Sequence, residues 1–269
     1  MAVLPRFLKY GCIILKITNP KIAGFPPLWA PFPGFSLLFD NPGQSPSPLP
    51  EGLQKLDCPV KKNPYLKLYQ ALSEAMDQLG REILFKDYSL CAMPENTYHV
   101  TVWDGLNAGN AETVSPNHSA ELQPFLKGLP AALLQDSTFI SPAEESPLTR
   151  KMARSITFKF RDLAKWSNTS LVAILMPVDG DSEQALEWIK RERVRLSNDY
   201  HNRFGIKRNR DFYPHVTLGY FANRDYTELA TPEVVHWNEV VHDMADGLTI
   251  TFDSISLYGF TDMVTFFRK

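Results

Sequence analysis

Two segments of the chain alternate between apolar and polar positions with the period of a β-strand, and both carry the same motif. Residues 97–103 contain His99-Val100-Thr101, and residues 213–221 contain His215-Val216-Thr217. Side chains two positions apart lie on the same face of a strand. Each motif therefore places an imidazole and a hydroxyl on one face and a branched apolar residue on the other. The pattern predicts two strands, each with one face for a core and one for a ligand.

The hydrophobic pattern also predicts the elements around these strands. Apolar residues recur every three or four positions over residues 65–79, which predicts a helix ended by Gly80. A longer helix with a buried stripe is predicted from a cap at Asp181 to about Phe204. A helix interrupted by Pro124 and Pro130 is predicted at residues 121–134. Further strands are predicted at residues 34–39, 154–160, 170–177, 248–258 and 263–267, with loops at 107–119 and 140–148.

Along the chain, a helix is followed by a strand with a His-x-Thr motif and then by further strands, and this order occurs twice. The repeated order favours a duplicated α+β unit over a parallel βαβ array. Residues 20–64 interrupt the pattern, because they hold 11 of the 21 prolines. Proline removes a backbone donor and fixes φ, so a long helix or a central strand is not expected there. We predict an extended arm that packs on the body through its aromatic residues.

Composition and charge narrow the class of protein. Hydrophobic residues make up 44% and charged residues 22%, as in ordinary soluble globular proteins. The net charge of -2 offers nucleic acid no overall attraction, so such a substrate would need a local patch. Three widely spaced cysteines without a CxxC pair suggest no disulfide framework or cysteine zinc site, and predict a reducing, cytoplasmic location. The sequence contains no run of about 18 apolar residues, so it predicts no membrane-spanning helix.

The two motifs together suit one kind of chemistry. An imidazole titrates near pH ~6.5, so one histidine can accept a proton while another donates one. Hydrolysis of a phosphodiester needs both transfers, and threonine hydroxyls can donate to the phosphate oxygens. No metal is required for such acid–base assistance, which is worth about 10²–10⁴-fold. A single His-x-Thr on a strand is usually structural, but two with matching surroundings favour a site.

In these two blocks the chain resembles a known family. Residues 93–105 and 213–220 resemble the signatures of the 2H phosphoesterase superfamily, named for paired His-x-Thr/Ser motifs. Its members include RNA 2′,3′-cyclic phosphodiesterases and RNA 2′-5′ ligase-like proteins. Residues 262–266 resemble the terminal strand of one uncharacterised branch. The resemblance implies an α+β fold of two pseudo-symmetric lobes, each an antiparallel sheet with outer helices, around a central cleft.

The resemblance also implies domains and roles. Residues 1–33 would form a proline-rich N-terminal extension, and residues 34–269 the bilobal 2H phosphoesterase-like domain. The acid–base pair would be His99 and His215, and Thr101 with Thr217 would bind phosphate. We take His99 as the base and His215 as the acid, although the choice depends on the direction in which substrate binds. The expected partner is a nucleotide or RNA 3′ end with a phosphodiester, without cofactor, metal or membrane.

Several aromatic and basic residues are candidates for substrate binding. On strand parity, Trp103, Tyr213 and Phe221 share faces with the histidines. Each could stack on a base of the substrate, which would contribute about 1–3 kcal/mol to binding, or simply pack at the rim of the sheet. Eight lysines and arginines between residues 190 and 210 could steer phosphates or form a solvated helix face.

The leading hypothesis is thus a metal-independent phosphodiester hydrolase in RNA processing, acting on a 2′,3′-cyclic phosphate or a 2′-5′ linkage. The alternative is a non-catalytic nucleotide-binding module that uses the same cleft. A third reading is an interaction domain that works through its proline-rich arm. Intact threonines beside both histidines disfavour that third reading.

Overall fold

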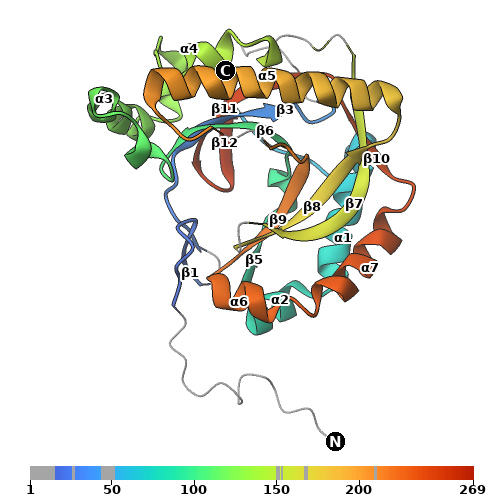
Figure 1. Cartoon of the computed structure of the whole chain (residues 1–269). Coiled ribbons are helices and arrows are strands. Elements are labelled where there is room, and N and C mark those ends of the chain that lie inside the picture. Colours follow the sequence, from blue (N-terminus) through green and yellow to red (C-terminus); the bar gives the residue numbers. More distant parts are fainter. Residues whose placement is uncertain are drawn as a thin grey trace, which may run out of the picture.

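In the part of the chain that the computed structural model describes, residues 16–25, 28–43, 52–149, 152, 154–166, 169–208 and 211–269, two five-stranded antiparallel sheets form two lobes (Figure 1). The first lobe holds, in spatial order, β4 (Gln54–Lys55), β12 (Thr265–Arg268), β11 (Ile255–Asp262), β3 (Gly34–Phe39) and β6 (Thr101–Asn107). The second holds β10 (Thr249–Phe252), β7 (Ile156–Trp166), β8 (Ser170–Pro177), β9 (His215–Phe221) and β5 (Leu90–Ala92). The predicted α+β class with two antiparallel lobes is confirmed.

The two lobes are joined where the two motifs meet. An antiparallel bridge pairs Val100, just before β6, with Val216 in β9. On its other side Val100 accepts a hydrogen bond from the backbone N–H of Phe39 in β3, at 3.1 Å. Both valines are fully buried. The apolar residue between His and Thr in each motif therefore forms the seam, and the motifs run past each other in opposite directions.

Helices cover the outer surfaces of both lobes (Figure 1). Beside the second lobe, α1 (Lys67–Gln78) packs on α7 (Val234–Ala245), and α7 packs on β7. Two shorter helices, α2 (Arg81–Tyr88) and α6 (Arg224–Leu229), flank its β5 and β9 end. The long α5 (Gly180–Phe204) lies over the first lobe with α3 (Pro116–Lys127) and α4 (Ser141–Glu144).

The contact between α5 and β6 shows why the long helix forms and where it docks. The apolar stripe of α5, including Ile189, Leu196 and Tyr200, is buried. The ring of Trp103 in β6 lies 4.6 Å from that of Tyr200, and its Nε1 donates to Ser197 Oγ at 3.1 Å. Burial of each such side chain stabilises the fold by roughly 1.5–3 kcal/mol. The helix thus holds the first histidine strand from behind.

A buried ion pair fixes the C-terminal strand to β3. Arg268 Nη1 lies 2.8 Å from Asp40 Oδ1, and both side chains are at most 2% exposed. Asp40 also accepts hydrogen bonds from the hydroxyls of Tyr258 at 2.8 Å and Ser256 at 2.7 Å. Arg268 donates further to Gln54 Oε1. A buried charge is tolerated when it is paired and hydrogen-bonded in this way.

Most predicted elements are confirmed, with shifts that have local causes. The α5 helix is capped by Asp179, which accepts from Ser182 N, and not by Asp181. The α3 helix begins at Pro116, inside a predicted loop, because proline fits the first turn of a helix. Residues 34–39 form a central strand despite the proline-rich surroundings, since prolines are absent from residues 34–41.

One predicted strand is divided between the lobes. Residues 248–258 were expected as a single run, but β10 pairs with β7 in the second lobe and β11 pairs with β3 in the first. The chain crosses between them at Asp253 and Ser254. The chain makes the same crossing earlier, because β5 lies in the second lobe and β6, which follows His99, lies in the first. The lobes are therefore interwoven.

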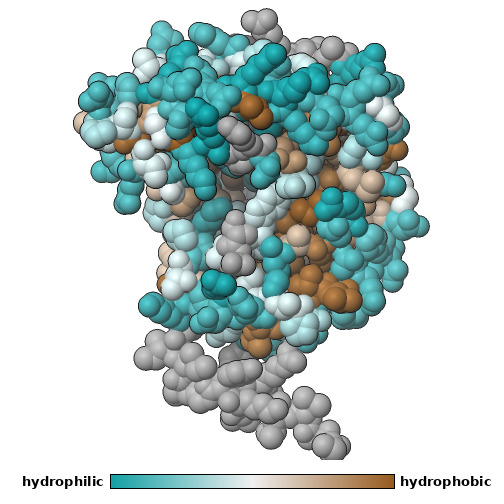
Figure 2. Space-filling view, viewed as in Figure 1, coloured by the Kyte–Doolittle hydropathy of each residue, from teal (hydrophilic) through white to brown (hydrophobic). Residues whose placement is uncertain are grey.

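The surface viewed in Figure 2 is largely polar, with apolar side chains exposed mainly between the lobes on the right. Among the described helices, none joins the length and the apolar character that crossing a bilayer requires.

Candidate active site

The two motifs line one cleft between the lobes, with a volume of about 480 Å³. His99, Thr101, His215 and Thr217 all contribute to its wall. Because Val100 is opposite Val216 in an antiparallel bridge, His99 lies opposite Thr217, and Thr101 opposite His215. Diagonal side chains of such a pair are roughly 7–8 Å apart. The four side chains thus form a square with the histidines at opposite corners, named here the His–Thr square.

Both imidazoles are held by the same contact. His99 Nδ1 lies 2.7 Å from the carbonyl oxygen of Thr97, and His215 Nδ1 lies 2.9 Å from that of Tyr213. A carbonyl oxygen only accepts, so Nδ1 carries a proton in each ring. When either ring is neutral, its Nε2 holds the free lone pair. Each ring also packs on an aromatic side chain, His99 on Phe266 at 4.5 Å and His215 on Trp166 at 4.4 Å.

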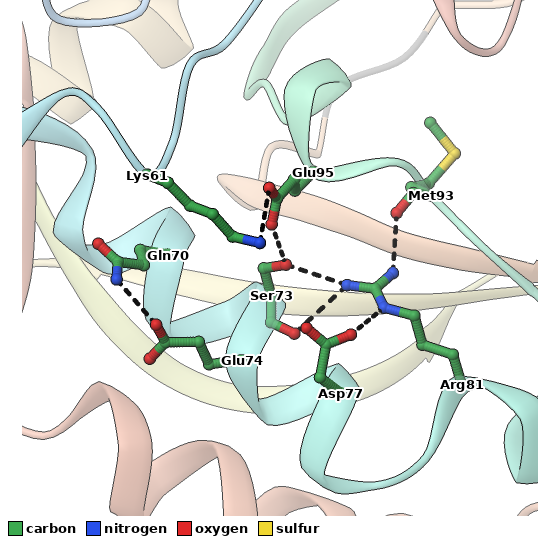
Figure 3. A network of polar contacts seen from close by, with 8 residues as sticks. All are labelled: Lys61, Gln70, Ser73, Glu74, Asp77, Arg81, Met93 and Glu95. Atoms are coloured by element: carbon green, nitrogen blue, oxygen red, sulfur yellow. Dashed lines mark hydrogen bonds and ion pairs between the residues drawn. The ribbon is translucent and has the colours of Figure 1, made fainter.

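The turn before His99 is braced by α1 and α2 through a polar network (Figure 3). Arg81 donates to the carbonyl of Met93 at 3.3 Å and to Ser73 Oγ at 3.0 Å. Ser73 Oγ donates to Glu95 Oε2 at 2.5 Å, and Lys61 lies 3.5 Å from Glu95. Glu95 opens the turn Glu95–Thr97, whose last carbonyl holds His99. The network therefore fixes the residue that orients the first imidazole.

Burial lowers the pKa of both histidines. For His99 desolvation is the largest cause, the charge of His215 adds to it, and the pKa falls to about 4. Desolvation also lowers the pKa of His215. The hydrogen bonds to Thr97 and Tyr213 and the carboxylate of Asp104 act in the opposite direction. Both rings are therefore neutral at pH 7 in the free protein.

A β-bulge changes the face of β6 just after the first motif. Thr101 pairs with Leu38 and Trp103 with the adjacent Leu37, so one extra residue is accommodated in β6. A bulge re-aims the side chains that follow it. Asp104 consequently lines the cleft, while Trp103 is 2% exposed and faces α5. The prediction that Trp103 binds substrate is wrong, because strand parity does not continue through the bulge.

The second motif is followed by a bulge at the same place. Thr217 pairs with Val172 and Gly219 with Leu171, which again leaves one extra residue in the strand. Tyr220 therefore lines the cleft, and Phe221 is fully buried in the core. The prediction for Phe221 is wrong for the same reason. Tyr213 does lie at the cleft, with 51% of its surface exposed and its ring 6.1 Å from Trp166.

The two segments thus share a longer pattern: His, Thr two positions later, and a cleft residue five positions after His. The fifth position is Asp104 in the first strand and Tyr220 in the second. In the neighbouring strands, Ser36 pairs with Asp104 and Ser170 pairs with Tyr220, and both serines reach the cleft. This spacing was visible in the sequence, but nothing there indicated that it mattered.

The basic stretch of α5 places a single buried cation in the cleft wall. Arg193 is 3% exposed, donates to the carbonyl oxygens of Val102 and Asp211, and lies over the Phe212 ring at 4.4 Å. Desolvation lowers its pKa to about 10, so it stays charged. The described remainder of the stretch lies mainly on the outer face, with ion pairs such as Arg195–Glu192, as a solvated face does. Arg210 lies outside the described residues.

No three His, Cys, Asp or Glu side chains gather as a metal site in the described ranges. Cys58 and Cys91 are free and buried, and burial is the largest cause that raises each pKa to about 12.

The chain was compared with known proteins by sequence and by structure. No family model and no curated protein matches the chain. A conserved protein of unknown function from Agrobacterium tumefaciens superposes with a TM-score of 0.53 at 11% identity, over 93% of this chain and 90% of that one. E. coli LigT complexed with 3′-AMP superposes with a TM-score of 0.37 at 11% identity, over 85% of this chain and 88% of that one. Kluyveromyces marxianus Usb1 superposes with a TM-score of 0.38 at 10% identity, over 87% of this chain and 97% of that one. The chain therefore shares the overall fold of the Agrobacterium protein.

Proposed function

We propose that this protein is a phosphodiester hydrolase that needs no metal and acts on a nucleotide or an RNA-derived substrate. A 2′,3′-cyclic phosphate or a 2′-5′ linkage is the expected substrate class. The observation that carries the proposal is the His–Thr square, in which two imidazoles held by the same backbone contact and two hydroxyls from distant segments share one cleft. The two His-x-Thr motifs also carry the resemblance to 2H phosphoesterases.

The proposed roles follow from the environments of the histidines. His99 has a pKa near 4, so its Nε2 is free to remove a proton from water over most of the pH range. The water oxygen then bonds to phosphorus as the bond to the leaving oxygen breaks. His215, once protonated, gives its proton to that oxygen. Thr101 and Thr217 donate hydrogen bonds to the non-bridging oxygens, and Arg193 adds positive charge at the cleft wall.

The lowered histidine pKa values predict activity that peaks on the acid side of neutrality. The active free enzyme has one protonated and one neutral imidazole, and the protonated fraction falls as pH rises past the lowered pKa values. We expect kcat/KM to fall below about pH 4 and to decline again before about pH 6.5. Initial rates at constant ionic strength from pH 3.5 to 8.5 measure this. A maximum above pH 7.5 would contradict it.

Arg193 provides a prediction about charge in the cleft. We expect Arg193→Met to lower kcat/KM by about 10–100-fold, because one buried positive charge facing the phosphate is lost. Arg193→Lys should recover part of the loss. The matched control is Arg191→Met on the exposed side of the same helix, which should leave kcat/KM unchanged. If the two Met variants fall equally, the cleft charge has no special role.

A substrate panel tests the activity itself. Nucleoside 2′,3′-cyclic phosphates, 2′-5′ and 3′-5′ dinucleotides are incubated with and without EDTA, and chromatography identifies which hydroxyl keeps the phosphate. Turnover that persists in EDTA supports the proposal. Turnover that EDTA abolishes, or tight calorimetric binding without turnover, refutes it. The second of these outcomes would favour the non-catalytic nucleotide-binding module.

A further inference from the structure

The segment before β3 crosses from one lobe to the other at one end of the cleft. Here the strap denotes its described residues, 16–25 and 28–33, which include β1 (Ile22–Gly24) and β2 (Leu28–Trp29). The backbone N–H groups of Thr18 and Asn19 donate to the carbonyl of Ala222 in the second lobe, at 2.9 and 3.0 Å. The N–H of Phe32 donates to the carbonyl of Thr261 in the first lobe, at 2.8 Å. Figure 1 shows the strap on the left of the molecule.

Asn19 locks the strap in place beside β9. It is 3% exposed, and its Nδ2 donates to the carbonyl of Phe221 at 2.9 Å. Its Oδ1 accepts from the backbone N–H of Lys21 at 3.0 Å, and the carbonyl of Lys21 accepts from Ala30 N at 3.0 Å. The backbone of Lys21 is therefore held on both sides, so its side chain has a defined starting point.

The side chain of Lys21 lies in the cleft wall. Its Nζ is 3.2 Å from the hydroxyl of Tyr220 and lies over the Tyr220 ring at 4.5 Å and the Phe32 ring at 5.5 Å. Within the described residues no carboxylate lies within 4.0 Å of this ammonium group. A partly buried cation that faces a cleft and lacks a carboxylate partner is suited to bind an anion from solution.

This cation lies toward one end of the cleft, beside a residue beyond the His–Thr square. Tyr220 lies three residues beyond Thr217 on β9, on the side away from His215. At about 3.3 Å per residue, this is roughly 10 Å along the strand. Lys21 thus lies toward the Tyr220 end of the cleft, where the next part of a substrate would extend.

We propose that Lys21 and the Tyr220 hydroxyl form a second anion site, which binds a phosphate group of the substrate other than the one that is cleaved. This inference rests on the proposed function, because it takes the group on the His–Thr square to be a phosphodiester. It names the substrate class more narrowly, as a nucleotide or oligonucleotide with at least two phosphate groups. The charge of Lys21 also lowers the pKa of both histidines, which is consistent with its facing them.

Binding of two product analogues tests the second site. Isothermal titration calorimetry compares adenosine 3′-phosphate with adenosine 3′,5′-bisphosphate for the full chain. We expect the bisphosphate to bind about tenfold more tightly to the unaltered protein, the effect of roughly one charge-assisted hydrogen bond. In Lys21→Met this ratio should fall to about one, and Lys21→Arg should restore it. The control Lys67→Met, exposed on α1 outside the cleft, should keep the ratio.

Each outcome decides the matter. A ratio near one for the unaltered protein, or a tenfold ratio that survives in Lys21→Met, would overturn the second site. The absence of any binding to the unaltered protein would overturn it as well. Because the measurement is binding, a tenfold ratio together with failure of the hydrolysis panel would refute the proposed activity while the second anion site stands.

Discussion

Replacing either motif histidine by alanine should lower kcat by about 10²–10⁴-fold, with little change in the free energy of unfolding. Each ring is the sole source of one proton transfer in the proposed reaction, whereas both rings are only partly buried and line the cleft, where each packs on an aromatic neighbour, Phe266 or Trp166. The double variant should lose less than the product of the two single losses, because groups that act as a unit are not additive. Steady-state rates on the best substrate of the panel, with circular dichroism melts, measure both quantities.

The matched control is His236→Ala, since that ring is 67% exposed on α7 and remote from the cleft. It should keep full activity. The pH profiles add a second distinction. His99→Ala should remove the acid limb of the kcat/KM profile and His215→Ala the alkaline limb, if His99 is the base. Exchange of these limbs would reverse the two roles, and activity within threefold of the original in both single variants would refute acid–base catalysis by this pair.

Replacing Arg268 by methionine should destabilise the fold by about 3–5 kcal/mol, because the buried Asp40 carboxylate loses its charged partner. The hydroxyls of Tyr258 and Ser256 remain bonded to Asp40, but they cannot neutralise its charge. For a chain of this size the melting temperature should fall by roughly 10 °C. Urea unfolding followed by tryptophan fluorescence gives the free energy.

Two further variants show whether the effect belongs to the pair. Lys269→Met removes the neighbouring, partly exposed ion pair with Glu144 and should cost less than about 1 kcal/mol. Asp40→Asn combined with Arg268→Met should recover part of the loss, because no unpaired charge stays buried. A single Arg268→Met variant that unfolds at the same urea concentration as the unaltered chain would show that the pair contributes no net stability.

The strands, the long helices and the fold class were predictable because they depend on local periodicity. Alternation of polar and apolar residues identifies the strand at residues 154–160, a continuous apolar run identifies the strand at residues 170–177, and the three-to-four repeat identifies α1 and α5. The pairing of His with Thr two positions later also follows from strand geometry. Neighbouring residues alone create these patterns, so no knowledge of the partner strands is needed.

The rest of the cleft depends on partners that are distant in sequence. Bulges after Thr101 and Thr217 arise from the register with β3 and β8, and they exchange Trp103 and Phe221 for Asp104 and Tyr220 in the cleft. The pattern of hydrophobic residues is the same with or without a bulge, so parity alone misplaces the aromatic residues.

The sequence alone therefore established the two His-x-Thr motifs, a strand at each of them and the class of fold, although β6 begins only at Thr101, two residues after His99. Only the folded chain decided that Val100 lies beside Val216, which brings the motifs together, and that Lys21 and Arg193 reach the same cleft. The physical reason is that side-chain periodicity is a property of a segment by itself. Convergence is a property of pairing between segments, and pairing is determined by burial summed over the whole core.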